Sequence, residues 1–275
     1  MSRPITAAEL YRIENNLTDR DRSILATLRM LRYAKTNQLQ RLFYPILTTH
    51  IAATSAVSRN LNRLKEYGMI AHLPKQIGGV RGGSQTLVWH LTEQGARLLA
   101  LGTEREGKRK RHLMPSPTFL RHTIAVTETY VQITELCRRD PDMKLIRMDV
   151  EPLCWRGYEK AGKVISLRPD LYVDTVSGGY LYSWFIEMDL STESVQMIVD
   201  KCKRYYEYYR TGKEQQATGV FPLVIWLVPT SERKQKMTEA IREAFKDRYE
   251  HLFLVIIPQE LHQILKAGAP EEHAC

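Results

Sequence analysis

The sequence predicts a protein of mixed α and β structure in two domains, and three observations carry this prediction. Apolar residues recur at helical spacing over about the first hundred residues, and two short strand-like runs follow. In the second half, helices alternate with strand-like runs, including the apolar segment Phe221 to Val228, which is typical of a buried central strand. Charge divides the chain in the same way: residues 1–117 hold 19 Lys and Arg against 8 Asp and Glu, a net +11, and the remainder carries −2.

Composition excludes several classes of protein. The sequence has no run of ~20 apolar residues, as a membrane-spanning helix requires, and residues 1–10 lack the apolar core of a signal peptide. A soluble, cytoplasmic protein without a membrane partner is expected. The four cysteines, at positions 137, 154, 202 and 275, show no paired spacing, so neither a zinc site nor a disulfide framework is indicated.

The first predicted domain covers residues 1–102. Thr18 with Asp19 and Asp21 indicates a helix start, and apolar residues at helical spacing follow. Further helices are predicted from Thr36 to Phe43 and from Thr54 to Tyr67, the latter ending before Gly68, which suits a C-terminal cap. The rest of the domain is predicted as a strand from Met69 to Leu73, a glycine-rich basic loop from Pro74 to Gln85, a strand from Thr86 to Leu91, and a helix capped by Thr92.

This order, with the segments LNRLKEYGMIAHL and LVWHLTEQGARLL, resembles a winged helix-turn-helix. The third helix would then enter the major groove of duplex DNA, and the excess of basic residues would release phosphate counterions. The alternative for this domain is a winged helix that contacts only proteins. The linker at residues 103–117 is expected to add phosphate contacts, and the alternative is that its charges are solvated and bind nothing specific. The expected DNA-binding residues are Ser58, Arg59, Asn62 and Arg63 on the helix, Lys75 and Arg81 in the loop, and Lys108, Arg109, Lys110 and Arg111 in the linker.

The second predicted domain covers residues 118–275. Its predicted elements are a helix at 118–138, strands at 144–150, 171–175 and 180–188, a helix at 193–210, a strand at 221–228, a helix at 232–245, a strand at 252–257 and a short helix from Gln259. This order resembles a restriction-endonuclease-like α/β domain with a mixed central sheet.

Two carboxylates in this domain stand where such a fold holds a metal. Asp170 opens one strand and Glu187 ends the next, a spacing that brings both carboxylates to one Mg²⁺ in active nucleases. Asp189 takes the place of the catalytic lysine. A lysine from the following helix is the remaining source of positive charge. On a wheel of about 100° per residue, with the apolar face at Val195, Val199, Cys202, Tyr206 and Tyr209, Lys201 and Lys203 lie about 100° to either side.

A purely structural interpretation of these carboxylates is also open. Asp170 then simply begins a strand, and Asp189, with Thr192 and Glu193, caps the next helix. Glu187 is harder to explain in this way, because a carboxylate among Trp184, Phe185 and Ile186 needs a partner. That partner is a cationic group, a lysine or a metal.

The segments SLRPDLYVD and YSWFIEMDLSTESVQMIVDKCKRYYEYY, together with the basic winged helix, resemble the replication-relaxation family of plasmids and mobile elements, with a PD-(D/E)xK nuclease-like domain. The resemblance implies a protein that binds double-stranded DNA sequence-specifically and acts in replication, relaxation or transcription regulation. Because E-x-D replaces E-x-K in that family, it also implies a catalytically silent second domain. That domain would form the contact of a homodimer or bind a replication, relaxase or regulatory protein. No cofactor is expected for it.

Two other functions remain open. One is a Mg²⁺-dependent endonuclease or nickase using Asp170, Glu187 and Asp189 with Lys201 or Lys203. The other is a non-enzymatic assembly protein that recognises other proteins.

Overall fold

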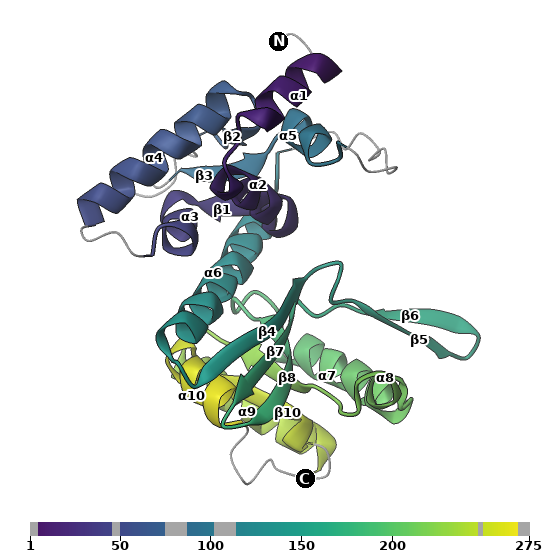
Figure 1. Cartoon of the computed structure of the whole chain (residues 1–275). Helices are drawn as coiled ribbons and strands as arrows, with labels where there is room; N and C mark the ends of the chain where they lie inside the picture. Colours follow the sequence, from purple (N-terminus) through teal and green to yellow (C-terminus); the bar gives the residue numbers. More distant parts are fainter. Residues whose placement is uncertain (1–4, 46–49, 75–86, 102–113, 247–249, 269–275) are drawn as a thin grey trace. The chain divides into compact units, whose positions relative to one another are not determined.

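A computed structural model describes residues 5–45, 50–74, 87–101, 114–246 and 250–268 (Figure 1). The chain divides into two compact units, Met1–Val131 (unit 1) and Gln132–Cys275 (unit 2). The division lies inside helix α6 (Pro117–Arg139), later than the linker expected at residues 103–117. The first half of α6 belongs to unit 1 because the Thr127 hydroxyl donates to the Tyr33 carbonyl and Glu128 pairs with Arg41.

Unit 1 combines helices with a small antiparallel sheet of order β1-β3-β2. The helix predicted at Thr36 to Phe43 is confirmed, whereas α4 begins four residues before the predicted start, and α1 and β1 were not predicted. Its elements before α6 are α1 (Ala7–Asn15), α2 (Asp19–Leu31), β1 (Tyr33–Lys35), α3 (Thr36–Phe43), α4 (His50–Glu66), β2 (Ile70–His72), β3 (Val88–Leu91) and α5 (Glu93–Leu98).

The start of α2 follows from a capping box. The Thr18 hydroxyl accepts from the Asp21 N–H at 3.2 Å, and the Asp21 carboxylate accepts from the Thr18 N–H at 2.8 Å. The predicted apolar face of this helix is confirmed, since Ile24, Leu25 and Leu28 are buried. Figure 1 shows α2 with α3 and α4 around the three-stranded sheet.

The segment Thr92 to Gly95, at the start of α5, is hydrogen-bonded to the residues that follow α4. The Thr92 hydroxyl donates to the carbonyls of Gly68 and Met69 and also accepts from the Gly95 N–H as the cap of α5. At Gly95 the backbones approach so closely that a Cβ atom would lie 2.2 Å from the Met69 carbonyl oxygen. A residue without a Cβ is therefore required there.

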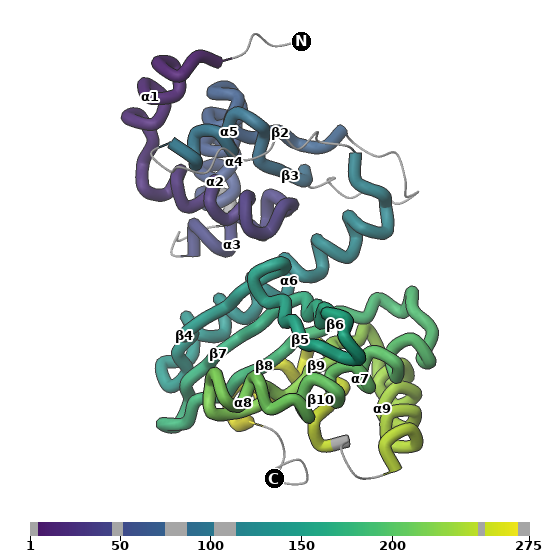
Figure 2. The backbone as a smooth tube through the Cα atoms, turned by 90° about the vertical axis from the view of Figure 1, so that its right-hand side faces the viewer, coloured from purple at the N-terminus to yellow at the C-terminus, as the bar shows by residue number. Residues whose placement is uncertain are grey.

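Unit 2 has a five-stranded sheet of order β10-β9-β8-β7-β4 (Figure 2). Strands β4, β7 and β8 pair antiparallel and β8, β9 and β10 parallel, so the predicted mixed sheet is confirmed. The β5–β6 hairpin and α8 were not predicted. After α6 the elements are β4 (Met143–Val150), β5 (Arg156–Lys160), β6 (Lys163–Leu167), β7 (Leu171–Ser177), β8 (Tyr180–Met188), α7 (Val195–Arg210), α8 (Lys213–Thr218), β9 (Leu223–Leu227), α9 (Ser231–Phe245), β10 (Phe253–Ile256) and α10 (Leu261–Ala267), with short 3₁₀ turns at Glu250–Leu252 and Pro258–Glu260.

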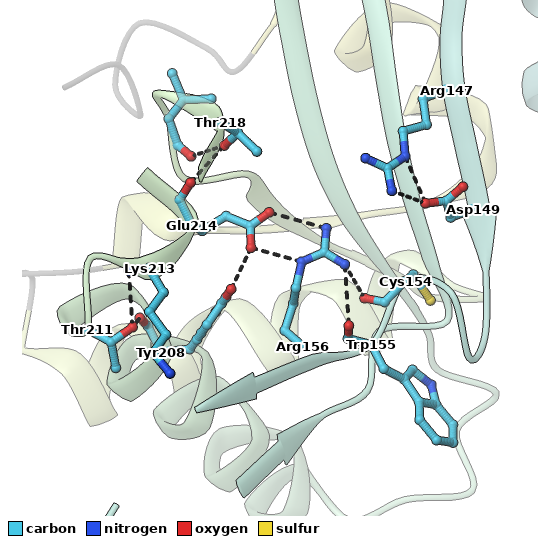
Figure 3. A network of polar contacts seen from close by, with 11 residues as sticks. Arg147, Asp149, Cys154, Trp155, Arg156, Tyr208, Thr211, Lys213, Glu214 and Thr218 are labelled. Atoms are coloured by element: carbon cyan, nitrogen blue, oxygen red, sulfur yellow. Dashed lines mark hydrogen bonds and ion pairs between the residues drawn. The ribbon is translucent and has the colours of Figure 1, made fainter. Parts of the chain in front are cut away.

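Helices α7 and α9 cover one face of the sheet. Phe185, Trp226 and Val255 of the sheet pack against the buried side chains of these two helices in one apolar core. Helix α10 contacts strand β7, and the Leu265 carbonyl accepts from Thr175. The β5–β6 hairpin is held to α7 and α8 by a polar network (Figure 3), in which Arg156 donates two hydrogen bonds to the buried Glu214 and the Tyr208 hydroxyl donates a third.

Among the described residues, no helix has the length and apolar character needed to cross a membrane.

Replacing Gly95 with alanine tests the close approach in unit 1. The added Cβ would meet the Met69 carbonyl and the Leu91 side chain, so we expect Gly95→Ala to lower the free energy of unfolding of unit 1 by about 1–3 kcal/mol. Urea denaturation measures this in a background where Trp155, Trp184 and Trp226 are replaced by phenylalanine, so that fluorescence reports the buried Trp89 of unit 1. Ala96→Ser, at the exposed neighbouring position, is the control and should unfold like the wild type; a Gly95→Ala midpoint equal to both would contradict the packing argument.

Candidate functional site

Glu187 lies near the end of β8, in the middle of the sheet of unit 2. The backbone of Glu187 pairs with Trp226 of β9, and the Glu187 side chain is buried beneath α7. The neighbouring Trp184, Phe185 and Ile186 are buried as well, so this carboxylate is out of contact with water. A buried carboxylate is costly unless other groups hydrogen-bond to it and balance its charge.

Two side chains of α7 meet this requirement. The Lys201 ammonium nitrogen lies 2.6 Å from Glu187 Oε2, and the Tyr205 hydroxyl donates to Oε1. The ammonium also lies 5.5 Å from the centre of the Trp226 ring, within range of a cation–π interaction. Glu187 therefore has a counter-charge and a hydrogen bond on both of its oxygens.

The buried face of α7 explains which lysine reaches the site. Its buried residues are Ile198, Val199, Cys202, Tyr205 and Tyr208, so the face is rotated from the predicted one, which included Tyr206 and Tyr209 in place of Tyr205 and Tyr208. Lys201 lies one turn from both Ile198 and Tyr205 and points toward the sheet. Lys203 is exposed and pairs with Asp200 at 3.2 Å, away from Glu187.

Asp170 lies directly before β7, beside the strand that carries Glu187. Leu171 pairs with Ile186, and the Asp170 N–H donates to the Ile186 carbonyl at 3.1 Å. Its Oδ2 accepts from the Met188 N–H at 2.8 Å. The two carboxylates expected to converge are thus adjacent on one face of the sheet.

Asp189, which stands at the predicted lysine position, is buried against an arginine of α9. Arg233 donates to both carboxylate oxygens, at 2.7 and 3.2 Å, and the Ser191 N–H donates at 3.1 Å. A further Arg233 N–H reaches the Glu193 carbonyl. The charge of Asp189, which takes the place of the catalytic lysine, is therefore balanced by Arg233.

The charges of this cluster shift the pKa values of its members. The pKa of Glu187 is raised to about 7. Burial is the largest cause, the nearby Asp170 adds to it, and Lys201 opposes it. Burial lowers the pKa of Lys201, but Glu187 and Asp170 outweigh burial and raise it above its ordinary value. Lys201 therefore stays protonated at neutral pH.

The described residues contain no group of three or more His, Cys, Asp or Glu side chains arranged to hold a metal ion. Asp170 and Glu187 supply two carboxylates. However, Glu187 already has a donor on each oxygen and Asp170 has one on Oδ2, so the cluster does not fit a divalent cation without displacing Lys201.

The face of α4 divides the four helix residues expected to bind DNA. Arg59 and Asn62 are exposed, as is Ser55, which shares their stripe along the helix, and Ser58 is half-buried. Arg63 points elsewhere: it donates to both oxygens of the buried Asp21, at 2.7 and 2.6 Å. Arg63 thus joins α4 to α2, while 38% of its side chain stays exposed.

Asp21 is the residue that sequence reasoning missed in unit 1. Besides Arg63 and Thr18, the Asn60 amide donates to it at 2.7 Å. Burial raises the pKa of Asp21, but the hydrogen bonds from Thr18, Asn60 and Arg63 outweigh burial and hold it below the ordinary 3.8. The other expected DNA-binding residues, Lys75, Arg81 and Lys108 to Arg111, lie outside the described residues.

A change of pH tests the environment of Glu187. Its ordinary pKa is 4.5 and its folded value about 7, so between these values the folded protein holds a proton that the unfolded chain releases. The contribution of Glu187 to stability therefore falls as the pH rises through this window. Relative to Glu187→Gln, we expect the wild type to lose roughly 2 kcal/mol of unfolding free energy between pH 5 and pH 8.

Urea denaturation at several pH values measures this difference. Glu243→Gln, which removes an exposed carboxylate of α9, is the matched control and should follow the wild type. Parallel profiles for the wild type and Glu187→Gln would show that the pKa of Glu187 is not raised.

Removing Arg63 tests its structural role. Arg63→Ala leaves the buried carboxylate of Asp21 without its counter-charge, and we expect unit 1 to lose about 1.5–3 kcal/mol of stability. The exposed Arg59→Ala is the matched control and should change stability by less than about 0.5 kcal/mol. Equal stabilities for the two variants, measured by urea denaturation, would contradict the structural role of Arg63.

Comparison with known proteins gives one match. A family model described as replication-relaxation matches residues 25–224, which extend from α2 in unit 1 to β9 in unit 2. No curated protein and no solved structure matched the chain. Because the family model covers well over half of the sequence, the chain belongs to the replication-relaxation family.

Proposed function

We propose that the protein binds duplex DNA sequence-specifically in the replication of a plasmid or mobile element, with unit 1 as the DNA-binding winged helix. Membership of the replication-relaxation family supports the replication role. The order α2-β1-α3-α4-β2-β3, with β3 in the middle of the sheet, is the order of a winged helix and supports the assignment of unit 1.

The observation that carries the proposal is the exposed stripe of α4. Ser55, Arg59 and Asn62 recur at intervals of three and four residues on the solvent side, while Val57, Leu61 and Leu64 on the other side are fully buried. A helix held in this way presents one arginine and one amide, which can make paired hydrogen bonds to guanine and adenine edges. The net charge of +11 in residues 1–117 would supply the phosphate-dependent part of the affinity.

Unit 2 is proposed as a nuclease-like scaffold that serves dimerisation or binds a replication protein. Its order of three antiparallel strands, a crossover helix and a parallel strand supports the nuclease-like assignment. The internal pairing of Glu187 with Lys201 and of Asp189 with Arg233 supports a silent site. A homodimer on a two-fold DNA site stays a prediction.

A second candidate function is Mg²⁺-dependent DNA nicking. The contact between Lys201 and Glu187 favours it, because a lysine beside a metal-binding carboxylate can orient an attacking water. Nicking of a supercoiled plasmid in Mg²⁺, lost in Glu187→Gln, would establish this function in place of a silent site.

Substitutions on the α4 stripe test DNA binding. After a preferred site has been selected from a random duplex library, we expect Arg59→Ala and Asn62→Ala each to weaken its binding by about 1–3 kcal/mol, roughly tenfold or more, and to relax the preference at one base pair. Fluorescence anisotropy at fixed salt measures the affinity.

Arg12→Ala, which removes an exposed arginine of α1, is the matched control and should bind like the wild type. If the wild type prefers no duplex sequence at physiological salt, the proposal fails and protein recognition becomes the better account of unit 1.

A further inference from the structure

The site around Glu187 raises the question of which cation balances its carboxylates. Glu187 lies in β8, and Asp170 lies directly before β7, where its Oδ2 accepts from the N–H of Met188, the residue after Glu187. A divalent cation bound there would need oxygen lone pairs at roughly 2.0–2.6 Å. The cation that the structure places against Glu187 is the Lys201 ammonium, at 2.6 Å from Oε2.

The surroundings of Lys201 are built to hold an ammonium group. Its side chain is about a quarter exposed, and its nitrogen lies 5.5 Å from the Trp226 ring centre. Tyr205, one turn further along α7, holds the second oxygen of Glu187 in place. The lysine is thus fixed by an aromatic ring below it and by an oriented carboxylate beside it.

The same cation hinders a metal. Two positive charges a few ångströms apart repel strongly where the dielectric constant is low. A divalent ion at Glu187 would have to drive the ammonium out and break its hydrogen bond. Asp189 offers no substitute, because Arg233 and the Ser191 N–H take both of its oxygens.

We propose that Lys201 occupies the place of a divalent cation beside Glu187 and Asp170, and that removing Lys201 opens a divalent-cation site. Shortening Lys201 to alanine vacates the volume of its side chain beside Asp170 and Glu187 and removes the ammonium that pairs with Glu187. This is the arrangement that oxygen-binding metal ions such as Mn²⁺ favour. The inference concerns unit 2 alone, and metal binding is measured without DNA, so it fails or holds independently of DNA binding by unit 1.

The test is Mn²⁺ binding at pH 8, measured as the loss of the electron paramagnetic resonance signal of free Mn²⁺. We expect Lys201→Ala to bind Mn²⁺ at least about tenfold more tightly than the wild type, whose binding should be too weak to detect. The double variant Lys201→Ala with Glu187→Gln should lose this binding. Lys203→Ala is the matched control, since it removes a lysine two residues away on the same helix that pairs with Asp200, and it should behave like the wild type.

Thermal melting keeps the test decisive if Lys201→Ala is unstable. An ion that binds only the folded state raises its melting temperature, so Mn²⁺ should raise the Tm of Lys201→Ala and leave that of the wild type unchanged. Mn²⁺ binding by the wild type that is lost in Glu187→Gln would overturn the proposal. A Lys201→Ala variant that gains neither Mn²⁺ binding nor a Tm shift would also overturn it.

Discussion

A carboxylate in the middle of a sheet cannot stay charged without a partner, and in unit 2 this constraint falls on Glu187. Its backbone pairs with Trp226 of β9, and the preceding Ile186 pairs with both β7 and β9, so the residue cannot turn toward water without disturbing the sheet. The partner has to come from the helix that covers it. Helix α7 supplies Lys201 and Tyr205 from adjacent turns, which fixes both the rotation of the helix and its height above β8. The apolar core between α7 and the sheet then forms around a polar contact with only one good geometry.

Unit 1 uses the same physical device at Asp21. This carboxylate caps the first turn of α2 and also accepts from Asn60 and Arg63, so one buried charge links the start of α2 to the last turns of α4. Since Arg63 pairs with the buried Asp21, the rotation of α4 about its axis is fixed, and the stripe that carries Arg59 is left facing solvent. The proposed reading of base edges would need such a fixed rotation, because each side chain would have to meet one base pair.

Local signals predicted much of the fold, and long-range pairing accounts for what they missed. Capping at Thr18 and apolar periodicity located α2, and the strands β7 and β8 were recognised from their turn and alternation. The hairpin β5–β6 was missed because each of its five-residue strands buries a single side chain, Tyr158 or Leu167, which is too few to reveal an alternation. The rotation of α7 was misjudged because tyrosines lie on both of its sides, so periodicity could not separate Lys201 from Lys203. Arg233 follows Asp189 by 44 residues, and no sequence spacing reveals such a pair.

The distribution of charge connects these local pairs to the proposed function. Beyond residue 117 the chain carries a net charge of −2, and its buried acids are matched one by one with lysine or arginine, as at Glu187 with Lys201 and at Glu214 with Arg156. Charges satisfied internally contribute little to the field outside the protein, so the nuclease-like cluster would neither attract nor strongly repel a phosphate backbone. The surplus of +11 lies in residues 1–117. Under the proposed function, this surplus would attract the phosphate backbone of DNA to residues 1–117, which include the α4 stripe.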